Sequence, residues 1–279
     1  MERKRLTITL KNSLLRRVDE TVDGAKIRNR SHAIEFLLSH ALPPQIKKAF
    51  ILAGGEGVKM RPFTYEMPKP MIPFRGKPLL EHTIEFLRKH GIKDYLINID
   101  YLGEKIEKHF GDGSSLGVKI TYVKEAKPSG TAGPLLEAKR FLKEPFILIY
   151  SDILIDIDLY DFINFHTSHD GLVTIGLTSV KEPEEFGVAE LKGPKIVEFS
   201  EKPKVSKTLS HLVNAGIYIM KPEIMKYIPK SRPPLSLEKL VLPKLAKEGN
   251  LFGYPFSGQW FDISTPNAYE KALRAWKGN

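Results

Sequence analysis

Residues 1–42 contain three short segments, each with one apolar face. Apolar and polar residues alternate over residues 6–10, which predicts a β-strand. Apolar residues at helical spacing then predict two helices, over residues 14–22 and 32–38. One short strand and two short helices bury too little surface to stand alone, so we expect this segment to dimerise.

Residues typical of helix ends and linkers set the boundaries of these elements. Gly24 lies where a helix C-cap is expected, and Ser31 lies where the N-cap of the second helix is expected. Two prolines at 43–44 then end the segment. We therefore predict two modules, residues 1–43 and residues 46–279.

From residue 46 the pattern changes to alternating strands and helices. The predicted order is strand 48–52, helix 79–90, strand 94–99, helix 103–110, strand 118–123, helix 133–141 and strand 146–150. Further strands are predicted at 172–178, 187–191, 196–199 and 215–220, and a further helix at 267–276. This alternation predicts an α/β domain with a Rossmann-like, mainly parallel sheet. Ligands of such sheets bind at the carboxyl ends of the strands.

Composition narrows the chemistry. The chain has no cysteine, which excludes disulfides, thiolate metal sites and cysteine nucleophiles. It shows neither an apolar run of membrane-spanning length nor an apolar signal core, so we expect a cytoplasmic protein. The net charge of +10 favours anionic partners, either nucleic acid or phosphorylated small molecules. A solvated, lysine-rich surface explains that charge equally well.

The first predicted strand of the larger module runs into a glycine-rich loop. Glycines at 54, 55 and 57 let backbone amides approach a triphosphate closely. The loop lacks the Gly-Lys-Ser/Thr ending of a P-loop. Further on, Lys69 lies between Pro68 and Pro70, whose stiff backbone suits a cation held against phosphates.

This loop and the segments after it resemble the sugar-1-phosphate nucleotidyltransferase family. In that family's order, the matching motifs are Leu52-Ala53-Gly54-Gly55, Pro68-Lys69-Pro70, Gly130-Thr131-Ala132-Gly133, Ser151-Asp152, Phe186-Gly187-Val188, Glu201-Lys202-Pro203, Asn214-Ala215-Gly216 and Trp260-Phe261-Asp262-Ile263. The match is closest to the mannose-1-phosphate guanylyltransferase and glucose-1-phosphate thymidylyltransferase branches. It implies a domain of the GT-A-like kind.

The resemblance also implies a role for each matching residue. The nucleotide would be bound by Leu52, Ala53, Gly54, Gly55, Gly57, Gly130 and Thr131. The sugar phosphate would be bound by Gly187, Glu201, Lys202 and Asn214. The catalytic residues would be Lys59, Lys69 and Asp152, and a Mg²⁺ ion would be held by Asp152 and Asp262. The implied reaction joins a nucleoside monophosphate to a sugar 1-phosphate and releases pyrophosphate, with GTP and mannose 1-phosphate favoured. It brings two anions together, so it needs positive charge and no side-chain nucleophile.

One departure from the family motif supports an alternative. The family's Thr-Arg-Leu is Val58-Lys59-Met60 here, and lysine lacks the bidentate fork of arginine. The alternative is a DNA-binding regulator whose degenerate enzyme domain senses a nucleotide sugar.

The first module is similar to the ribbon-helix-helix family of DNA-binding proteins. In that family paired strands enter the major groove, so Arg5, Thr7 and Thr9 would face the bases. Ser31, at the start of the second helix, would hold a backbone phosphate. The resemblance implies a homodimer or higher homo-oligomer. A dimerisation arm without a DNA function remains the other interpretation.

Overall fold

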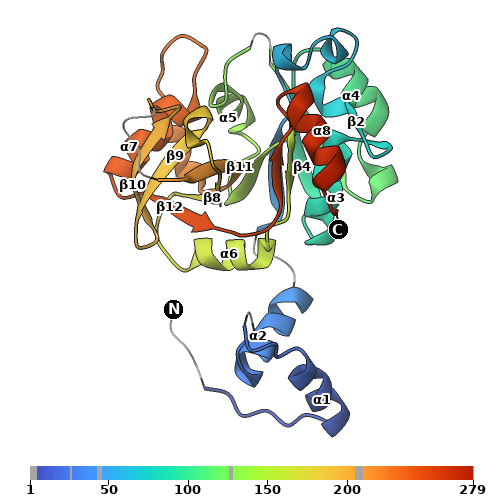
Figure 1. Cartoon of the computed structure of the whole chain (residues 1–279), viewed down its shortest axis with the longest axis vertical. Helices are drawn as coiled ribbons and strands as arrows, with labels where there is room; N and C mark the ends of the chain where they lie inside the picture. Colours follow the sequence, from blue (N-terminus) through green and yellow to red (C-terminus); the bar gives the residue numbers. More distant parts are fainter. Residues whose placement is uncertain (1–4, 26, 43–45, 126–127, 205–209, 279) are drawn as a thin grey trace. The chain divides into compact units, whose positions relative to one another are not determined.

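The chain divides into two compact units, Met1–Gln45 and Ile46–Asn279 (Figure 1). The structure is a computed structural model, and it describes residues 5–25, 27–42, 46–125, 128–204 and 210–278. None of the helices in these ranges is long and apolar enough to cross a membrane.

The smaller unit is a pair of helices, α1 (Asn12–Glu20) and α2 (Arg30–Ala41). The Arg30 guanidinium donates two hydrogen bonds to the Asp19 carboxylate, at 2.7 and 2.8 Å, and so ties α2 to α1. Among the described residues of this unit, Val18 and Ala33 are the apolar side chains that are fully buried. Two small side chains are a minimal core for a folded unit.

Three predictions for this unit need correction. Helix α1 ends at Glu20, and its C-cap is Thr21 and not Gly24. Residues 5–11 form neither helix nor strand, because a β-ladder needs a partner strand and the single chain supplies none here. The N-cap of α2 is Asn29 and not Ser31: the Asn29 side chain accepts a hydrogen bond from the His32 amide at 3.0 Å. Asparagine caps as well as serine, and its position one residue before Arg30 starts the helix earlier than predicted.

A nine-stranded sheet forms the centre of the larger unit. Its strand order is β5 (Lys119–Lys124), β4 (Asp94–Ile99), β1 (Lys48–Leu52), β6 (Phe146–Tyr150), β11 (Leu212–Met220), β8 (Val173–Ser179), β12 (Leu251–Pro255), β10 (Lys195–Glu201) and β9 (Gly187–Lys192). The first four strands are parallel, as are β8 and β12. Strand β11 runs antiparallel to both of its neighbours in this order, β6 and β8. The α/β class is therefore confirmed, and the sheet is parallel in its first half and mixed beyond it.

Both faces of the sheet are covered because successive strand residues point to opposite sides. In β1, Phe50 enters one core cluster, whereas Ala49 and Ile51 enter the other. The second cluster is closed by α3 (Leu79–Lys89), α4 (Gly103–Phe110) and α6 (Leu159–Thr167). The first is closed by α5 (Gly133–Ala138), the π-helical turn η8 (Leu237–Val241) and α7 (Leu242–Lys247). Figure 1 shows α3 and α4 on one side of the sheet and α5 and α7 on the other.

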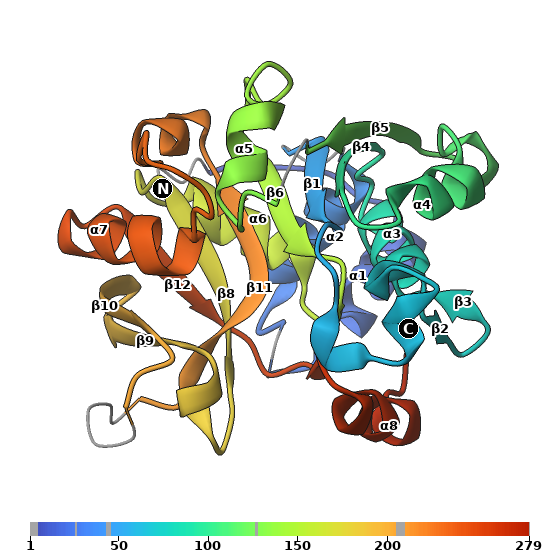
Figure 2. The ribbon, with the colours of Figure 1, turned by 90° about the horizontal axis from the view of Figure 1, so that it is seen from above.

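A third, smaller core lies beside the sheet. It joins the hairpin β2 (Pro73–Phe74) and β3 (Lys77–Pro78) to the last helix, α8 (Pro266–Ala275). Figure 2 shows where the hairpin and α8 lie beside the sheet. The ring of Phe74 packs edge-on against Tyr269 in α8. Strand β13 (Trp260–Asp262) pairs with β7 (Ile153–Ile155) and carries the chain back to this core. Short 3₁₀ turns complete the unit: η1 (Val58–Met60), η2 (Phe63–Tyr65), η3 (Lys69–Met71), η4 (Ser114–Leu116), η5 (Pro183–Glu185) and η7 (Pro222–Lys226).

Candidate active site

The glycine-rich loop follows β1, where the carboxyl ends of the parallel strands meet. The Ala53 amide donates to the Asn98 carbonyl at the end of β4, at 3.1 Å. The Ser151 amide after β6 donates to the Leu52 carbonyl, also at 3.1 Å. A Cβ atom at Gly54 would lie 2.8 Å from the Asn98 side-chain oxygen. The loop therefore runs close to its neighbours, and a side chain at position 54 would force them apart.

Gly57 turns this loop into η1. Its φ of 60° lies in the left-handed region, and a Cβ atom there would lie 2.9 Å from Thr64 and 3.2 Å from Lys69. The Thr64 hydroxyl donates to the Gly57 carbonyl at 2.9 Å and fixes the turn. The exposed side chain of Lys59 follows in η1, close enough to Asp262 for its positive charge to act on that carboxyl.

Lys69, Asp152 and Asp262 come together from three distant parts of the chain. The Lys69 ammonium donates to the Asp152 carboxylate, and both side chains are about one-fifth exposed, at 21% and 19%. Strand β13 brings Asp262 to this pair, since the Ile263 amide donates to the Asp152 carbonyl at 2.8 Å. The site thus has one cation and two carboxylates in a largely buried place.

Burial and charge act against each other in this group. Burial alone would lower the pKa of Lys69, but the charges of Asp152 and Asp262 and the hydrogen bond to Asp152 raise it. The ammonium therefore stays protonated. Burial, and then the charge of Asp152, raises the pKa of Asp262 to about 6. Two carboxylates crowded in this way repel each other, and a further cation would relieve that repulsion.

Asp152 and Asp262 fit a divalent cation with oxygen ligands. Among the residues that the structure describes, no group of three or more His, Cys, Asp or Glu side chains could hold a metal ion. An ion held by these two carboxylates would therefore take its remaining ligands from water and substrate phosphates, as Mg²⁺ commonly does.

The Gly130–Thr131 turn is held against residues 235–238. Gly130 has a φ of 83°, and a Cβ atom on it would lie 2.5 Å from the Leu235 carbonyl oxygen. The Thr131 hydroxyl donates to the Glu238 carboxylate at 2.7 Å and accepts from the Leu237 amide at 2.8 Å. The Thr131 hydroxyl therefore donates to and accepts from groups of the protein itself, and its bonds hold the turn on residues 235–238.

The predicted sugar-phosphate residues lie on β9, β10 and β11. Gly187 and Glu201 face each other across the β9–β10 ladder, and a Cβ atom at Gly187 would lie 2.9 Å from the Glu201 carboxylate. Burial, and then the charge of Glu238, raises the pKa of Glu201. Lys202 is exposed and has a φ of 48°, with its amide donating to the Phe186 carbonyl at 2.9 Å. The Asn214 amide group donates to the Tyr218 hydroxyl at 2.5 Å.

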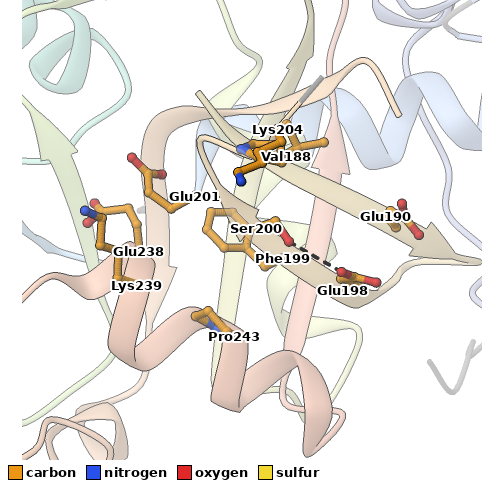
Figure 3. A pocket seen from close by; sticks show the side chains of 11 residues that line it. Val188, Glu190, Glu198, Phe199, Ser200, Glu201, Lys204, Glu238, Lys239 and Pro243 are labelled. Carbon is orange, nitrogen blue, oxygen red and sulfur yellow. Dashed lines mark hydrogen bonds between the residues drawn. The ribbon is translucent and has the colours of Figure 1, made fainter. Parts of the chain in front are cut away.

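A hollow of about 580 Å³ lies over this part of the sheet (Figure 3). Its lining residues are Val188, Glu190, Glu198, Phe199, Ser200, Glu201, Pro203, Lys204, Glu238, Lys239 and Pro243. Figure 3 shows Glu201 and Glu238 toward one end and Glu190 and Glu198 toward the other. Of the four predicted sugar-phosphate residues, Glu201 lines the hollow, whereas Gly187, Lys202 and Asn214 are not part of its lining.

Two buried or half-buried carboxylates near the site were missed by the sequence reasoning. The Glu125 carboxylate accepts from the Asn98 amide group at 2.8 Å and lies beside Gly54. Glu238 is 8% exposed and accepts from Thr131. A signal for Glu238 was present, because it lies among the leucine and valine residues of the segment 235–242, although Lys239 beside it shares that signal.

The predicted DNA-contact residues belong to the smaller unit. Arg5, Thr7, Thr9 and Ser31 are all exposed. The first three lie in the segment that forms no strand in the single chain, and Ser31 lies in the first turn of α2.

Comparison with known proteins shows which family the larger unit resembles. The family model described as nucleotidyl transferase matches residues 48–277. The chain is 38% identical over 236 residues to a rice (Oryza sativa subsp. japonica) protein assigned as mannose-1-phosphate guanylyltransferase 1, covering 82% of this chain and 64% of that protein. It is also 38% identical over 228 residues to the mannose-1-phosphate guanylyltransferase catalytic subunit beta of Danio rerio, covering 80% of this chain and 62% of that one. The chain thus spans a little under two thirds of the length of these relatives.

A solved structure agrees with this match. A Bacillus anthracis protein assigned as a glucose-1-phosphate thymidylyltransferase, crystallised with sucrose, superimposes with a TM-score of 0.76 at 28% identity, covering 83% of this chain and 96% of that one. The predicted family is confirmed: this chain belongs to the nucleotidyl transferase family.

Proposed function

We propose that this chain transfers a nucleoside monophosphate from a nucleoside triphosphate to a sugar 1-phosphate, with GTP and mannose 1-phosphate as substrates. The choice of substrates is supported by the two mannose-1-phosphate guanylyltransferases at 38% identity. The observation that carries the proposal is the grouping of Lys69 with Asp152 and Asp262 at the carboxyl ends of the parallel strands.

The geometry suits phosphoryl chemistry without a covalent enzyme intermediate. A phosphate oxygen of the sugar 1-phosphate attacks the α-phosphorus of GTP, and the bond from that phosphorus to the oxygen of the leaving pyrophosphate breaks. Lys69, kept protonated by its two carboxylate neighbours, binds the α-phosphate and offsets the charge that develops there. Asp152 and Asp262 would hold a Mg²⁺ ion, which would neutralise phosphate charge and help align the two substrates. Lys59, whose charge also acts on Asp262, would bind the leaving pyrophosphate.

The roles of the two aspartates can be tested by replacements that keep side-chain shape. Asp152→Asn and Asp262→Asn should each reduce Mg²⁺-dependent pyrophosphate release from GTP and mannose 1-phosphate by at least about 100-fold, because each removes a charged metal ligand. Asp170→Asn, an exposed position in the same unit, is the matched control and should retain the wild-type rate. Wild-type rates in both site variants would overturn the assignment.

For the smaller unit we propose a ribbon-helix-helix module that joins two or more copies of the chain. Its exposed apolar side chains support this: Leu6 is 82% exposed, Ile8 54% and Leu42 61%. Burying such apolar side chains against a second copy lowers the free energy of the complex and so favours association. In a paired ribbon Arg5, Thr7 and Thr9 would project together, which supports DNA as the ligand.

Association and DNA binding can be separated by experiment. Leu6→Ser/Ile8→Ser should lower the molar mass measured by light scattering, whereas Leu240→Ser, also exposed but in the larger unit, should not. Arg5→Ala should weaken binding to a preferred DNA sequence more than binding to unrelated DNA, because a side chain that faces the bases carries sequence preference. If wild-type protein associates but binds no DNA at low salt, the module is an assembly device only. The regulator alternative, which rests on Lys59 replacing the family arginine, would then fall.

A further inference from the structure

Glu238 is a buried carboxylate to which the reaction proposed above assigns no role. It lies in the π-helical turn η8 and is 8% exposed. Three hydroxyl groups donate to it: Thr131 at 2.7 Å and Ser236 at 2.8 Å to one oxygen, and Tyr150 to the other. A buried carboxylate is costly unless it is hydrogen-bonded, and these three donors offset that cost.

One arm of this network leads to the sugar side of the site. The Tyr218 hydroxyl donates to the Tyr150 hydroxyl at 3.3 Å, and the Asn214 amide group donates to Tyr218 at 2.5 Å. The other end of the Asn214 side chain accepts from the Gly216 amide at 3.0 Å. Burial, and then the charge of Glu238, raises the pKa of Tyr218, so its hydroxyl keeps its proton.

The direction of donation along this arm is fixed by its end point. Each hydroxyl has a single proton to donate, whereas an ionised carboxylate can only accept. The hydrogen bonds therefore all point the same way: Asn214 donates to Tyr218, Tyr218 donates to Tyr150, and Tyr150 donates to Glu238. The Asn214 side chain is thus oriented from both ends, by the Gly216 amide at its oxygen and by the chain of hydroxyls leading to Glu238 at its nitrogen.

The other arm leads to the nucleotide side. Thr131 donates to Glu238, and the Leu237 amide donates to Thr131 at 2.8 Å. The Ala132 amide donates to the Leu235 carbonyl, also at 2.8 Å. These bonds seat the Gly130–Thr131 turn on the segment that carries Glu238.

We propose that Glu238 is a positioning residue that holds both substrate-binding sides of the site in register, the nucleotide side through Thr131 and the sugar-phosphate side through Tyr150. This rests on the function proposed above. Glu238→Gln tests it because an amide has one acceptor oxygen, whereas the three hydroxyls need acceptors at both positions. Either Tyr150 or the Thr131–Ser236 pair then faces an N–H group and loses the acceptor for its hydroxyl proton, so the hydrogen bonds along that arm must rearrange.

The decisive variants cut one arm each. Thr131→Val removes the hydroxyl on the nucleotide arm and should raise the KM for GTP about fivefold or more, with the KM for mannose 1-phosphate within about twofold. Tyr150→Phe removes the hydroxyl on the other arm and should raise the KM for mannose 1-phosphate about fivefold or more, with the KM for GTP within about twofold. Glu238→Gln should raise both values. Thr167→Val and Tyr227→Phe, whose hydroxyls bond outside this network, are the matched controls and should change neither value.

The split between the two KM values separates positioning from general damage. A role in stability alone would lower the unfolding midpoint and change both KM values together in all three variants, and that result would overturn the proposal. Unchanged KM values in Glu238→Gln would also overturn it. If Glu238→Gln does not fold, the opposite patterns of Thr131→Val and Tyr150→Phe decide.

Failure of the proposed reaction is distinguishable from failure of this inference. If wild-type protein releases no pyrophosphate, GTP binding is measured by calorimetry. Thr131→Val should then weaken GTP binding about fivefold or more, while Tyr150→Phe leaves it within about twofold. Equal effects in the two variants, or no binding of GTP to the wild type, would overturn the inference.

Discussion

Gly130→Ala should destabilise the larger unit far more than an equivalent replacement elsewhere. Gly130 has a φ of 83°, and Gly117 has a φ of 68°, so alanine in the left-handed region costs about 1 kcal/mol at either position. A Cβ atom at Gly117 meets nothing within 4 Å. At Gly130 it would lie 2.5 Å from the Leu235 carbonyl oxygen and 2.8 Å from the Leu235 nitrogen. One of the two backbone segments must therefore move.

The size of the extra effect follows from the bonds that such a movement breaks. The Ala132 amide donates to the Leu235 carbonyl, and the Leu235 amide donates to the Ser129 carbonyl, both at 2.8 Å. At about 1 kcal/mol each, their loss makes Gly130→Ala about 2 kcal/mol more destabilising than Gly117→Ala. Urea unfolding followed by tryptophan fluorescence measures this, because both tryptophans, Trp260 and Trp276, lie in the larger unit. Equal unfolding midpoints for the two variants would refute the reasoning.

Three further predictions address charge. Lys202→Ala should raise the KM for mannose 1-phosphate roughly 30-fold, equivalent to about 2 kcal/mol for a lost charge-assisted contact, and steady-state kinetics showing an unchanged KM would contradict this. Lys59→Arg should raise kcat, because the bidentate fork adds stabilisation as charge moves to pyrophosphate; no gain in single-turnover rate would favour the sensing alternative. Burial, and then His169, lowers the pKa of His166 to about 3, below its unfolded value of about 6.5, so the unfolded state binds the proton first as pH falls. Stability from this residue is complete above pH 6.5 and declines below it, by about 2 kcal/mol at pH 5; urea midpoints at pH 7.5 and 5 should therefore differ less in His166→Gln than in wild type.

Elements with strong hydrophobic patterns could be predicted from the sequence. The strands at 48–52, 94–99 and 146–150 and the helix at 103–110 have the predicted bounds, because apolar runs and helical spacing are local signals. The alternation of Asp156-Ile157-Asp158 matches the exposure of these residues but not their backbone, because both aspartates are exposed and Ile157 is buried in a segment that forms no strand. It is typical of a solvent-facing strand edge, yet the Asp158 side chain caps α6 by accepting from the Tyr160 and Asp161 amides.

The site depended on pairings that no local pattern encodes. Motif resemblance pointed to Asp152 and Asp262, but only the β7–β13 ladder shows how they meet. The roles of Thr131 and Glu238 in one network arise from a turn and a π-helical segment far apart in the sequence. The sequence alone does not show whether a hydroxyl bonds to the protein or to a ligand, because that depends on hydrogen-bond partners that only the structure gives. The cytoplasmic location expected from the sequence stays a prediction.

The central claim is nucleotidyl transfer, and the fate of the GTP phosphates tests it most directly. The chain of 279 residues would be incubated with Mg²⁺, mannose 1-phosphate and GTP labelled at either the α- or the γ-phosphate. The account predicts that the α-label appears in GDP-mannose and the γ-label in pyrophosphate, and that both products require the sugar phosphate. Binding of GTP or GDP-mannose with no labelled GDP-mannose formed, or release of label without mannose 1-phosphate, would contradict it.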